Sequence, residues 1–481
     1  MSFDLRASAR EEMIREGFDP DFSPSVEEQI KTIRTRSFTV AGNGVRDLRD
    51  RLWSSIDNQT SHDLDQVEFA ERVDGGIRVL IGIADVDSEV PIRSPIDQHA
   101  ASQTTTVYTP ARIFPMLPLA LSNGTTSLSP DSDRLAVVVE MLVANDGSIL
   151  SSDVYRAAVR NRFQLVYDAI GPWLEGKAAP PPNVAAATEL QAQLKLQDEA
   201  ACNLREQRHR LGALDFDRIE AQPIMDDGEV RGIAARHANR ATNLIEDFMI
   251  AANEVMAQRL THAGLSIVRR VVKTPRRWPR IVQLAASYGM NLPAEPDSSA
   301  LAAFLNRQKL IDELHYADLS LALVKLMGPG EYVLSRAGDP PQGHFALAAH
   351  DYTHSTAPNR RFADLVTQRL IKAELTKQPA PYFDGELDQI ARNCTLKEDA
   401  ARKVERTMGK RAAALAFRNR KGQSFNAVIT GVSAKGVFVR VLNPPIEGRL
   451  MHGEREVDVG DKIRVTLLNT DPQRGYIDFE R

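Results

Sequence analysis

The chain has 481 residues, of which 43% are hydrophobic, so it is long enough to bury a large core in more than one domain. Its net charge of −4 excludes a uniformly basic nucleic-acid binder but allows a local basic channel. Without a secretory signal or an apolar stretch of roughly 18 residues, we expect a cytoplasmic protein without membrane contact, and its two distant cysteines argue against a disulfide framework.

The first forty residues predict a small helical domain. Two segments with helical periodicity, 7–15 and 26–33, bracket the turn-rich stretch Asp19-Pro-Asp-Phe-Ser-Pro24. This pattern favours a helix-turn-helix-like or winged-helix unit over residues 1–40.

An acidic segment follows. Carboxylates at Asp57, Asp63 and Asp65 stand just before an apolar run, 77–84, that predicts a strand. Carboxylate oxygens suit Mg²⁺, with Mn²⁺ as the alternative, and Mg²⁺ is commonly held by a few carboxylates together with waters and substrate phosphates. The segment therefore predicts a metal site that acts on a phosphate ester.

Two other interpretations of the acidic segment stay open. Acidic loops are commonly solvated turns. The spacing from Asp57 to Glu68 also imitates a calcium loop of about twelve residues. In that loop, however, His62 would stand where glycine is required, and a strand pattern replaces the exiting helix. The calcium interpretation is therefore the weaker one.

The middle of the chain predicts a body of mixed helices and strands. Residues 137–143 read as a buried strand, whereas residues 185–211 and 235–260 have helical periodicity and strong helix formers. The fold class expected for this body is α+β.

A second polar segment ends at Asp364 and leads into residues 365–372, whose apolar positions recur at helical spacing. Pro358 is expected to start this helix, because proline is tolerated in a first turn. A helix N-terminus with Arg360 and Arg361 close by offers backbone donors and positive charge to a phosphate. The alternative is an arginine pair bonded to Asp364 on an exposed helix.

Two basic clusters are candidates for a channel that binds a polyanion. The first surrounds Trp278, and the second, residues 402–421, has eight basic residues and the single acid Glu405. The members of the first cluster are Arg269, Arg270, Lys273, Arg276, Arg277 and Arg280. A solvated helix face is the ordinary explanation of such runs.

The last segment, residues 422–481, predicts a small β-barrel. Short β-rich runs separated by glycine recur from Gln423 onward. The pattern resembles the S1-type OB fold, a five-stranded all-β barrel that binds single strands. Phe438 and His452 are its best candidates for base contact, although either residue also suits the core or the rim of a barrel.

Together, the acidic segment and the arginine segment resemble the catalytic domain of the ribonuclease II (RNB) family. The motifs that carry the resemblance are Ser55-Ile-Asp57, Asp63-Leu-Asp65 and His354-Ser-Thr-Ala-Pro-Asn-Arg-Arg-Phe-Ala-Asp364. Further segments follow in the family's order: 83–87, 115–118, 121–124, 133–136, 212–216 and 244–253. Ordered matches over most of the chain are far more specific than one motif.

This resemblance implies a processive 3′-to-5′ exoribonuclease that acts on RNA ends and releases nucleoside 5′-monophosphates, in RNA turnover or processing. It also implies an α+β RNB catalytic domain over residues 41–421, followed by the OB-fold domain over residues 422–481. Single-stranded RNA is the expected partner, with 3′-overhang duplex RNA as a second candidate.

The resemblance also implies roles for the site residues. Asp57, Asp63 and Asp65 match acids that organise the metal and the attacking water. Arg360 matches the arginine that stabilises the pentacovalent phosphate, and Arg361 beside it is expected to contact RNA.

Two more residues match family positions near the RNA 3′ end. Tyr108 matches a tyrosine that packs on the last bases, whereas an isolated tyrosine would be read as a core residue. Glu405 matches a glutamate near the RNA 3′ end, whereas its helical spacing alone would suggest a surface charge pair.

The sequence departs from the family pattern at Gln66. Familiar family members carry a fourth aspartate directly after the position of Asp65, and glutamine offers only a neutral carbonyl oxygen. Affinity at oxygen sites depends on the charge of the ligands, so metal binding is expected to weaken. Two interpretations follow: an enzyme in which Gln66, water or another acid completes the metal shell, or a catalytically degenerate RNA-binding regulator. A third, a phosphoesterase for small nucleotides, fits poorly with the C-terminal barrel.

The front of the chain also departs from familiar relatives. About forty residues precede the catalytic match, too few for the paired N-terminal cold-shock barrels of those relatives. Fewer clamps at the channel mouth would let duplex RNA approach more closely. A digestion that stalls several nucleotides before a duplex would count against this hypothesis.

Overall fold

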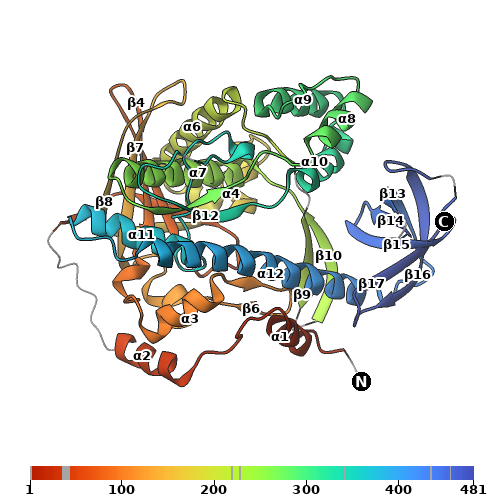
Figure 1. Cartoon of the computed structure of the whole chain (residues 1–481), viewed down its shortest axis with the longest axis horizontal. Coiled ribbons are helices and arrows are strands. Elements are labelled where there is room, and N and C mark those ends of the chain that lie inside the picture. Colours follow the sequence, from red (N-terminus) through yellow and green to blue (C-terminus); the bar gives the residue numbers. More distant parts are fainter. Residues whose placement is uncertain are drawn as a thin grey trace.

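The computed structural model describes residues 3–34, 44–217, 220–226, 229–340, 342–433, 436–455 and 457–481. Figure 1 shows a body of helices and strands with a small barrel at its C-terminal side, joined by the long helix α12 (Asp384–Phe417). None of the helices in the described parts of the chain combines the length and apolar character that crossing a bilayer requires.

A six-stranded sheet forms the centre of the body. Its strands, in the order β1-β8-β2-β3-β4-β7, are β1 (Val45–Asp47), β8 (Ile149–Val166), β2 (Trp53–Asp57), β3 (Gln66–Val73), β4 (Gly76–Ala84) and β7 (Asp133–Val143). The long strand β8 pairs with β7 through its first two thirds and with β2 through its last residues. The first and the last strand of the series β2-β3-β4-β7 are therefore both paired with β8.

The core lies between this sheet and the helices that cover it. Strands β4 and β7 supply buried Val, Ile and Ala side chains, as expected of strands covered on both sides. Three helices pack into the same core: α6 (Thr188–Arg210), α7 (Arg240–His262) and α11 (Phe362–Leu375). The strand predicted over 137–143 and the helices predicted over 185–211 and 235–260 are confirmed by β7, α6 and α7.

Short elements connect these parts of the body. The helical ones are η1 (Val86–Ser88), α3 (Pro95–Gln103), η2 (Leu121–Thr125), α4 (Tyr167–Leu174), α5 (Pro182–Ala185) and η3 (Phe345–Leu347). The strands form three pairs, β5 (Val107–Tyr108) with β6 (Ile113–Phe114), β9 (Glu220–Asp226) with β10 (Glu229–Arg236), and β11 (Ile267–Val271) with β12 (Glu331–Ser335).

The first two helices pack on different parts of the body. Helix α1 (Leu5–Arg15) shares an apolar cluster with α12 and β5, whereas α2 (Pro24–Arg34) contributes Val26 and Ile33 to the main core. This arrangement differs from the helix-turn-helix-like unit expected over residues 1–40, because each helix buries its apolar side against the body. Residues 35–40 lie outside the described residues, so the extent of an N-terminal domain stays a prediction.

Two further units complete the molecule. Helices α8 (Trp278–Ser287), α9 (Ser298–Ile311) and α10 (Glu313–Met327) enclose an apolar cluster of their own. The C-terminal strands close a barrel in the order β13-β14-β15-β17-β16. They are β13 (Ser424–Ser433), β14 (Gly436–Val441), β15 (Ile446–His452), β16 (Lys462–Asp471) and β17 (Tyr476–Glu480). The predicted fold class, α+β with a C-terminal all-β barrel, is confirmed.

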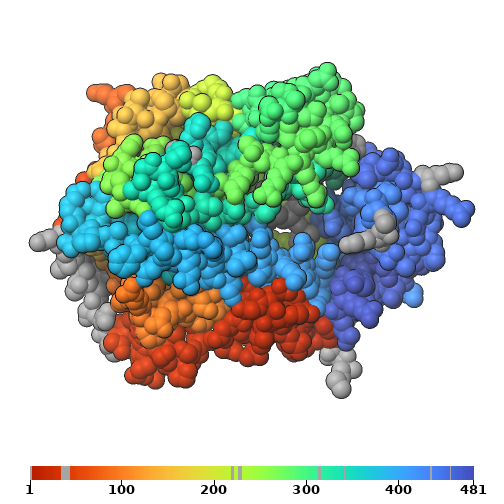
Figure 2. All heavy atoms as spheres, in the orientation of Figure 1, coloured from red at the N-terminus to blue at the C-terminus, as the bar shows by residue number. Residues whose placement is uncertain are grey.

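The barrel is attached to the body through the end of α12. Ala414 and Phe417 of this helix belong to the apolar cluster that fills the barrel. Arg440 of β14 adds an ion pair with Asp318 of α10 (3.1 Å). Figure 2 shows the barrel standing directly beside the end of α12, with α1 below this helix.

Candidate active site

The acidic segment lies between β2 and β3, and a neighbouring loop fixes its backbone. Ser127 Oγ donates to the carbonyl of His62 (2.8 Å) and accepts from the N–H of Leu64 (3.1 Å). The carbonyl of Asp65 accepts from the N–H of Ala84 at the end of β4 (2.9 Å). These bonds hold the carboxylate-bearing backbone in place without help from a ligand.

The arginine segment is held by a second strand-like contact. The N–H of Thr106 donates to the carbonyl of Arg360 (3.0 Å), and the N–H of Phe362 donates to the carbonyl of Thr104 (2.8 Å). The helix expected to start at Pro358 instead starts at Phe362. That expectation was wrong because residues 358–360 form only a turn, and Arg361 after it is extended and pairs with Thr105 instead of continuing a helix.

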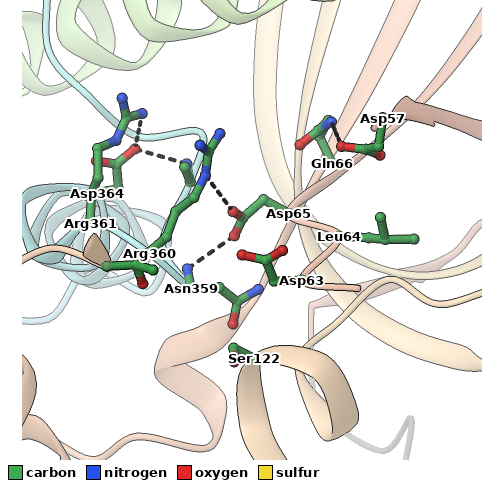
Figure 3. Close-up of polar contacts among 12 residues, drawn as sticks. Asp57, Asp63, Leu64, Asp65, Gln66, Ser122, Asn359, Arg360, Arg361 and Asp364 are labelled. Carbon is green, nitrogen blue, oxygen red and sulfur yellow. Dashed lines mark hydrogen bonds and ion pairs between the residues drawn. The ribbon is translucent and has the colours of Figure 1, made fainter. Parts of the chain in front are cut away.

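The two segments meet at Asp65. Its Oδ1 accepts from the N–H of Asn359 (3.0 Å), and its Oδ2 pairs with Arg360 Nε (3.3 Å). Figure 3 shows Asp63 and Asp65 near this arginine segment, whereas Asp57 lies apart with Gln66. Asp65 is buried, but the Arg360 side chain is 47% exposed and can still face a ligand.

Tyr108 connects the acidic segment to α12. Its hydroxyl donates to Asp63 Oδ2 (3.1 Å), and its backbone N–H donates to Glu405 Oε1 (2.9 Å). The tyrosine ring is partly exposed, at 39%, so it is not the core residue that its type alone would suggest. The structure therefore brings Tyr108, Asp63 and Glu405 together from three distant parts of the sequence.

Asp57 forms the other half of the acidic segment. Its Oδ1 accepts from Gln66 Nε2 (3.3 Å), while its Oδ2 is buried without a hydrogen-bond partner among the described residues. Glu68, two residues after Gln66, is fully buried, and both of its carboxylate oxygens also lack such a partner.

Burial dominates the electrostatics of these acids. It raises the pKa of Asp65 to about 7 and that of Asp57 to about 6, although the charge of Arg360 acts in the opposite direction on both. Burial, and then the like charge of Asp57, raise the pKa of Glu68 well above its usual range. Positive charge placed among these groups would therefore favour their ionised forms.

The chemistry of these groups fits a divalent cation. Asp57 and Glu68 offer buried, unpartnered carboxylate oxygens, which are ligands that Mg²⁺ and Mn²⁺ prefer. Within the described residues, no group of three or more His, Cys, Asp or Glu side chains is arranged so that it can hold a metal ion. Mg²⁺ commonly takes only one or two protein carboxylates. A site with few carboxylates is therefore compatible with the absence of a larger acidic group among the described residues. Metal binding by Asp57, Asp63 and Asp65 together stays a prediction.

A cavity of about 1030 Å³ reaches the acidic segment at Asn58 and is lined by many charged groups. Its basic side chains are Arg205, Arg208, Arg236, Arg270, Lys309 and Arg402. Several are already paired with acids, such as Arg205 with Asp247 (2.9 Å) and Arg270 with Glu398 (2.6 Å). A lining of this kind suits a polyanionic chain that exchanges ion pairs as it binds.

The basic residues predicted to form two clusters lie in different environments: some are buried in ion pairs, and others line the cavity. Arg269 is buried and paired with Asp351, so it stabilises the fold. Arg270 and Arg402 line the cavity, one from each cluster. Arg361, expected to contact RNA, pairs with the buried Asp364 (2.7 Å). An ion pair with Asp364 was the alternative interpretation, although the helix that carries Asp364 is buried rather than exposed.

The two barrel residues lie outside the acidic site. Phe438 on β14 is 38% exposed, and His452 at the end of β15 is exposed as well. Phe438 stands opposite Arg449 in the register of β14 and β15, which puts an aromatic and a basic group on one surface. Base contact by Phe438 and His452 stays a prediction.

Sequence reasoning missed two residues of the site. Asn359 fixes Asp65 through its backbone N–H, a contact that side-chain motifs do not report. Glu68 lies in a strand whose neighbours Val67 and Phe69 are buried apolar residues. The available signal was an acidic residue inside an apolar strand, because burying a charge costs free energy unless the charge is paired or binds a metal.

Known families match most of the chain. The RNB domain matches residues 45–377, and the RNase II-type exonuclease C-terminal S1 domain matches residues 423–481. Ribonuclease R of Thermotoga maritima is 31% identical over 469 residues, which cover 91% of this chain and 64% of the relative. Several curated ribonuclease R relatives are matched over 55% to 64% of their length, so the chain spans little more than half of them.

Solved structures share the fold. RNase R of Mycoplasma genitalium, in complex with ribose methylated single-stranded RNA, has a TM-score of 0.88 at 23% identity, over 99% of this chain and 78% of that one. Yeast Ssd1, described as a pseudonuclease, has a TM-score of 0.70 at 19% identity, over 93% of this chain and 55% of that one. The same fold thus carries both a nuclease and a pseudonuclease, and the residues of the site have to decide between them.

Proposed function

Since this chain belongs to the RNB domain family, we propose that it is a metal-dependent exoribonuclease that hydrolyses RNA from its 3′ end. The observation that carries the proposal is the meeting of two loops at Asp65, which contacts both Asn359 and Arg360. A buried carboxylate next to a half-exposed guanidinium is an arrangement that serves phosphoryl transfer.

In this proposal the carboxylates and the arginine have separate tasks. Asp57, Asp63 and Asp65 hold the divalent cation, Mg²⁺ or Mn²⁺, which would supply an activated water and neutralise charge on the phosphate. Arg360 uses its Nε to bind Asp65, and the exposed part of its guanidinium faces the phosphate on which negative charge develops. The N–H of Asn359 keeps Asp65 in the orientation that this contact requires.

The RNA would be held at three places along the molecule. Tyr108 stacks on a base near the 3′ end while its hydroxyl touches Asp63, and Glu405 supports the tyrosine backbone. The charged cavity receives the phosphates, and Phe438 of the barrel contacts bases farther along the strand. Contacts at several places keep the strand bound between successive cleavages.

We therefore propose processive release of nucleoside 5′-monophosphates from single-stranded ends, in RNA turnover or processing. A duplex with a 3′ overhang is the second substrate that we propose, because its single-stranded end fits the same contacts. The cytoplasmic location expected from the sequence stays a prediction.

A direct test uses a single-stranded RNA labelled at its 3′ end, with Mg²⁺, with Mn²⁺ and with EDTA. We expect mononucleotide release that requires the cation, and a loss of turnover of about 10³-fold or more in Asp65→Asn, because this residue contacts several groups of the site. The variant also controls for a contaminating nuclease. Wild-type protein that binds the RNA but releases nothing with either cation would contradict the proposal.

One observation favours a second candidate, a non-catalytic RNA-binding regulator. Gln66 occupies a position where familiar relatives carry an acid, and its amide donates to Asp57 rather than offering a charge. The same release assay separates the two candidates. RNA binding without release under several divalent cations would favour the regulator.

A further inference from the structure

Glu68 is a buried acid that the proposed reaction does not yet use. It lies on β3 two residues after Gln66, so both side chains are on the same face of the strand. The residue is 0% exposed, and neither carboxylate oxygen has a hydrogen-bond partner among the described residues. A buried carboxylate without a partner is costly, and a bound ion is one of the few ways to compensate that cost.

The face of β3 that carries Glu68 turns toward Asp57. Gln66, on the same face, donates to Asp57 Oδ1 (3.3 Å), and Asp57 is also the charged group that acts on Glu68. Ser54, the partner of Glu68 in the register of β2 and β3, has a buried hydroxyl that likewise finds no hydrogen-bond partner in the part of the chain that the structure describes. Ser54 and Glu68 thus carry unsatisfied oxygen atoms on one face of the paired strands, and Gln66 on the same face of β3 connects that face to Asp57.

We propose that Glu68 and Asp57 form a carboxylate pair that binds a divalent cation, with Glu68 in the place of the acid that Gln66 lacks. This inference rests on the proposed function, because it concerns the cation of that reaction. Strand geometry points the two side chains the same way, since positions 66 and 68 lie on the same side of β3, about 6.6 Å apart along the strand. The glutamate side chain is one methylene longer than that of aspartate, so it covers a small part of this separation, and a cation at this site would lie on the Glu68 side of Asp57.

The alternative explanation is that Glu68 is a neutral acid that only fills the core. Both explanations account for its burial, but they differ in what the carboxylate does when a cation is added. A ligand loses affinity for the cation when its charge is removed, whereas a core residue does not. Cation binding therefore separates them without reference to nuclease activity.

The experiment is a calorimetric titration of Mn²⁺ into the full chain after treatment with EDTA, without RNA. We expect Glu68→Gln to weaken Mn²⁺ binding by at least about 10-fold, the lower end of the losses seen when even indirect partners of a metal site are removed. Glu254→Gln is the matched control, because Glu254 on α7 is also a glutamate whose pKa burial raises, and its affinity should match that of the wild type.

A rescue makes the test specific. In the double variant Gln66→Asp/Glu68→Gln the acid returns to position 66, and most of the Mn²⁺ affinity should return with it. Glu68→Asp is a second single variant in case Glu68→Gln does not fold. Because the aspartate side chain is shorter, this variant should bind Mn²⁺ more weakly than the wild type. Wild-type affinity in Glu68→Gln or in Glu68→Asp would overturn the proposal.

The outcomes also separate this proposal from the proposed function. If Mn²⁺ binding depends on Glu68 but the protein releases no nucleotide, the cation site stands and the exoribonuclease assignment fails. If the wild type releases nucleotides and Glu68→Gln binds Mn²⁺ as tightly as the wild type does, the exoribonuclease assignment stands and the cation site at Glu68 fails. A wild type that neither binds Mn²⁺ nor releases nucleotides contradicts both.

Discussion

The acidic site and the C-terminal barrel present their candidate functional residues in opposite ways. Asp65 is buried and bonded to residues almost three hundred positions away in the chain. Phe438, by contrast, is exposed on a barrel built from one continuous segment. A change in the site therefore affects partners from several elements, while a change on the barrel surface stays local. Chemistry needs the first arrangement, and tolerant strand binding needs only the second.

The sharpest test of this contrast is Arg360→Ala. We expect kcat to fall by about 10²- to 10³-fold, because an electrostatic group aimed at developing charge is removed. The affinity for RNA should change much less, since most contacts with the strand lie elsewhere. Steady-state digestion of labelled RNA at saturating concentration measures the first quantity and fluorescence anisotropy the second. Arg336→Ala, an exposed arginine paired with Asp384 at the start of α12, is the control. Equal losses in affinity and turnover would break the contrast.

The second test uses pH. The folded-state pKa of Asp57, about 6, lies above its ordinary value, so folding favours the protonated form. In metal-free protein this residue contributes stability that is present below pH 4 and is lost as the pH rises through about 6. The difference between this pKa and its ordinary value corresponds to about 3 kcal/mol. We expect Asp57→Asn to remove this contribution.

Urea unfolding in EDTA at several pH values measures this effect. The difference in unfolding free energy between Asp57→Asn and wild type should move by about 3 kcal/mol in favour of the variant between pH 4 and pH 7. The barrel variant Phe438→Ala should run parallel to the wild type, because it removes no titratable group. Parallel curves for Asp57→Asn would show that Asp57 titrates in the folded protein as it does in the unfolded chain.

The third test concerns the barrel. Phe438→Ala should weaken binding of single-stranded RNA by about 1–3 kcal/mol, the contribution of one stacked base, and leave kcat at saturating RNA unchanged. Leu442→Ala serves as the matched control, since it removes another half-exposed apolar side chain near the end of the same strand. The affinity for an unlabelled RNA of mixed sequence can be measured by its competition with a labelled RNA. An unchanged affinity would exclude Phe438 as a base contact.

The smallest effect is expected at the contact between barrel and body. Arg440 pairs with Asp318 of α10 (3.1 Å) and with Glu447 of its own barrel (3.1 Å). A double-mutant cycle with Arg440→Ala and Asp318→Ala should give a coupling energy below about 1 kcal/mol, as is usual for partly exposed ion pairs. A larger coupling, measured by urea unfolding, would mean that the barrel is more rigidly docked than this single contact suggests.

Several features could be predicted from the sequence because they depend on short stretches of chain. The helices α6 and α7 follow from apolar residues at helical spacing, and strand β7 follows from a run of Val residues. The glycine-separated β runs predicted the barrel. The motifs around Asp57 and Arg360 identified the family, and their resemblance supplied roles that periodicity alone does not assign.

Other features depended on contacts between distant segments. Helix α11 begins at Phe362 rather than at Pro358, because the preceding backbone pairs with residues 104–106. Helices α1 and α2 were expected to form one unit, but each finds its apolar partner elsewhere in the body. In both cases the local pattern was compatible with two structures, and the long-range contact selected one.

The sequence by itself determined which residue types are available: an acidic segment, an arginine segment, a β-rich C-terminus and a glutamine where relatives carry an acid. Only the tertiary structure decided which of them meet. It joins Asp65 to Arg360 and Tyr108 to Asp63, and it buries Glu68 with no hydrogen-bond partner for its carboxylate among the described residues. The physical reason is that periodicity and spacing describe one segment at a time, whereas burial and pairing arise when separate segments pack together.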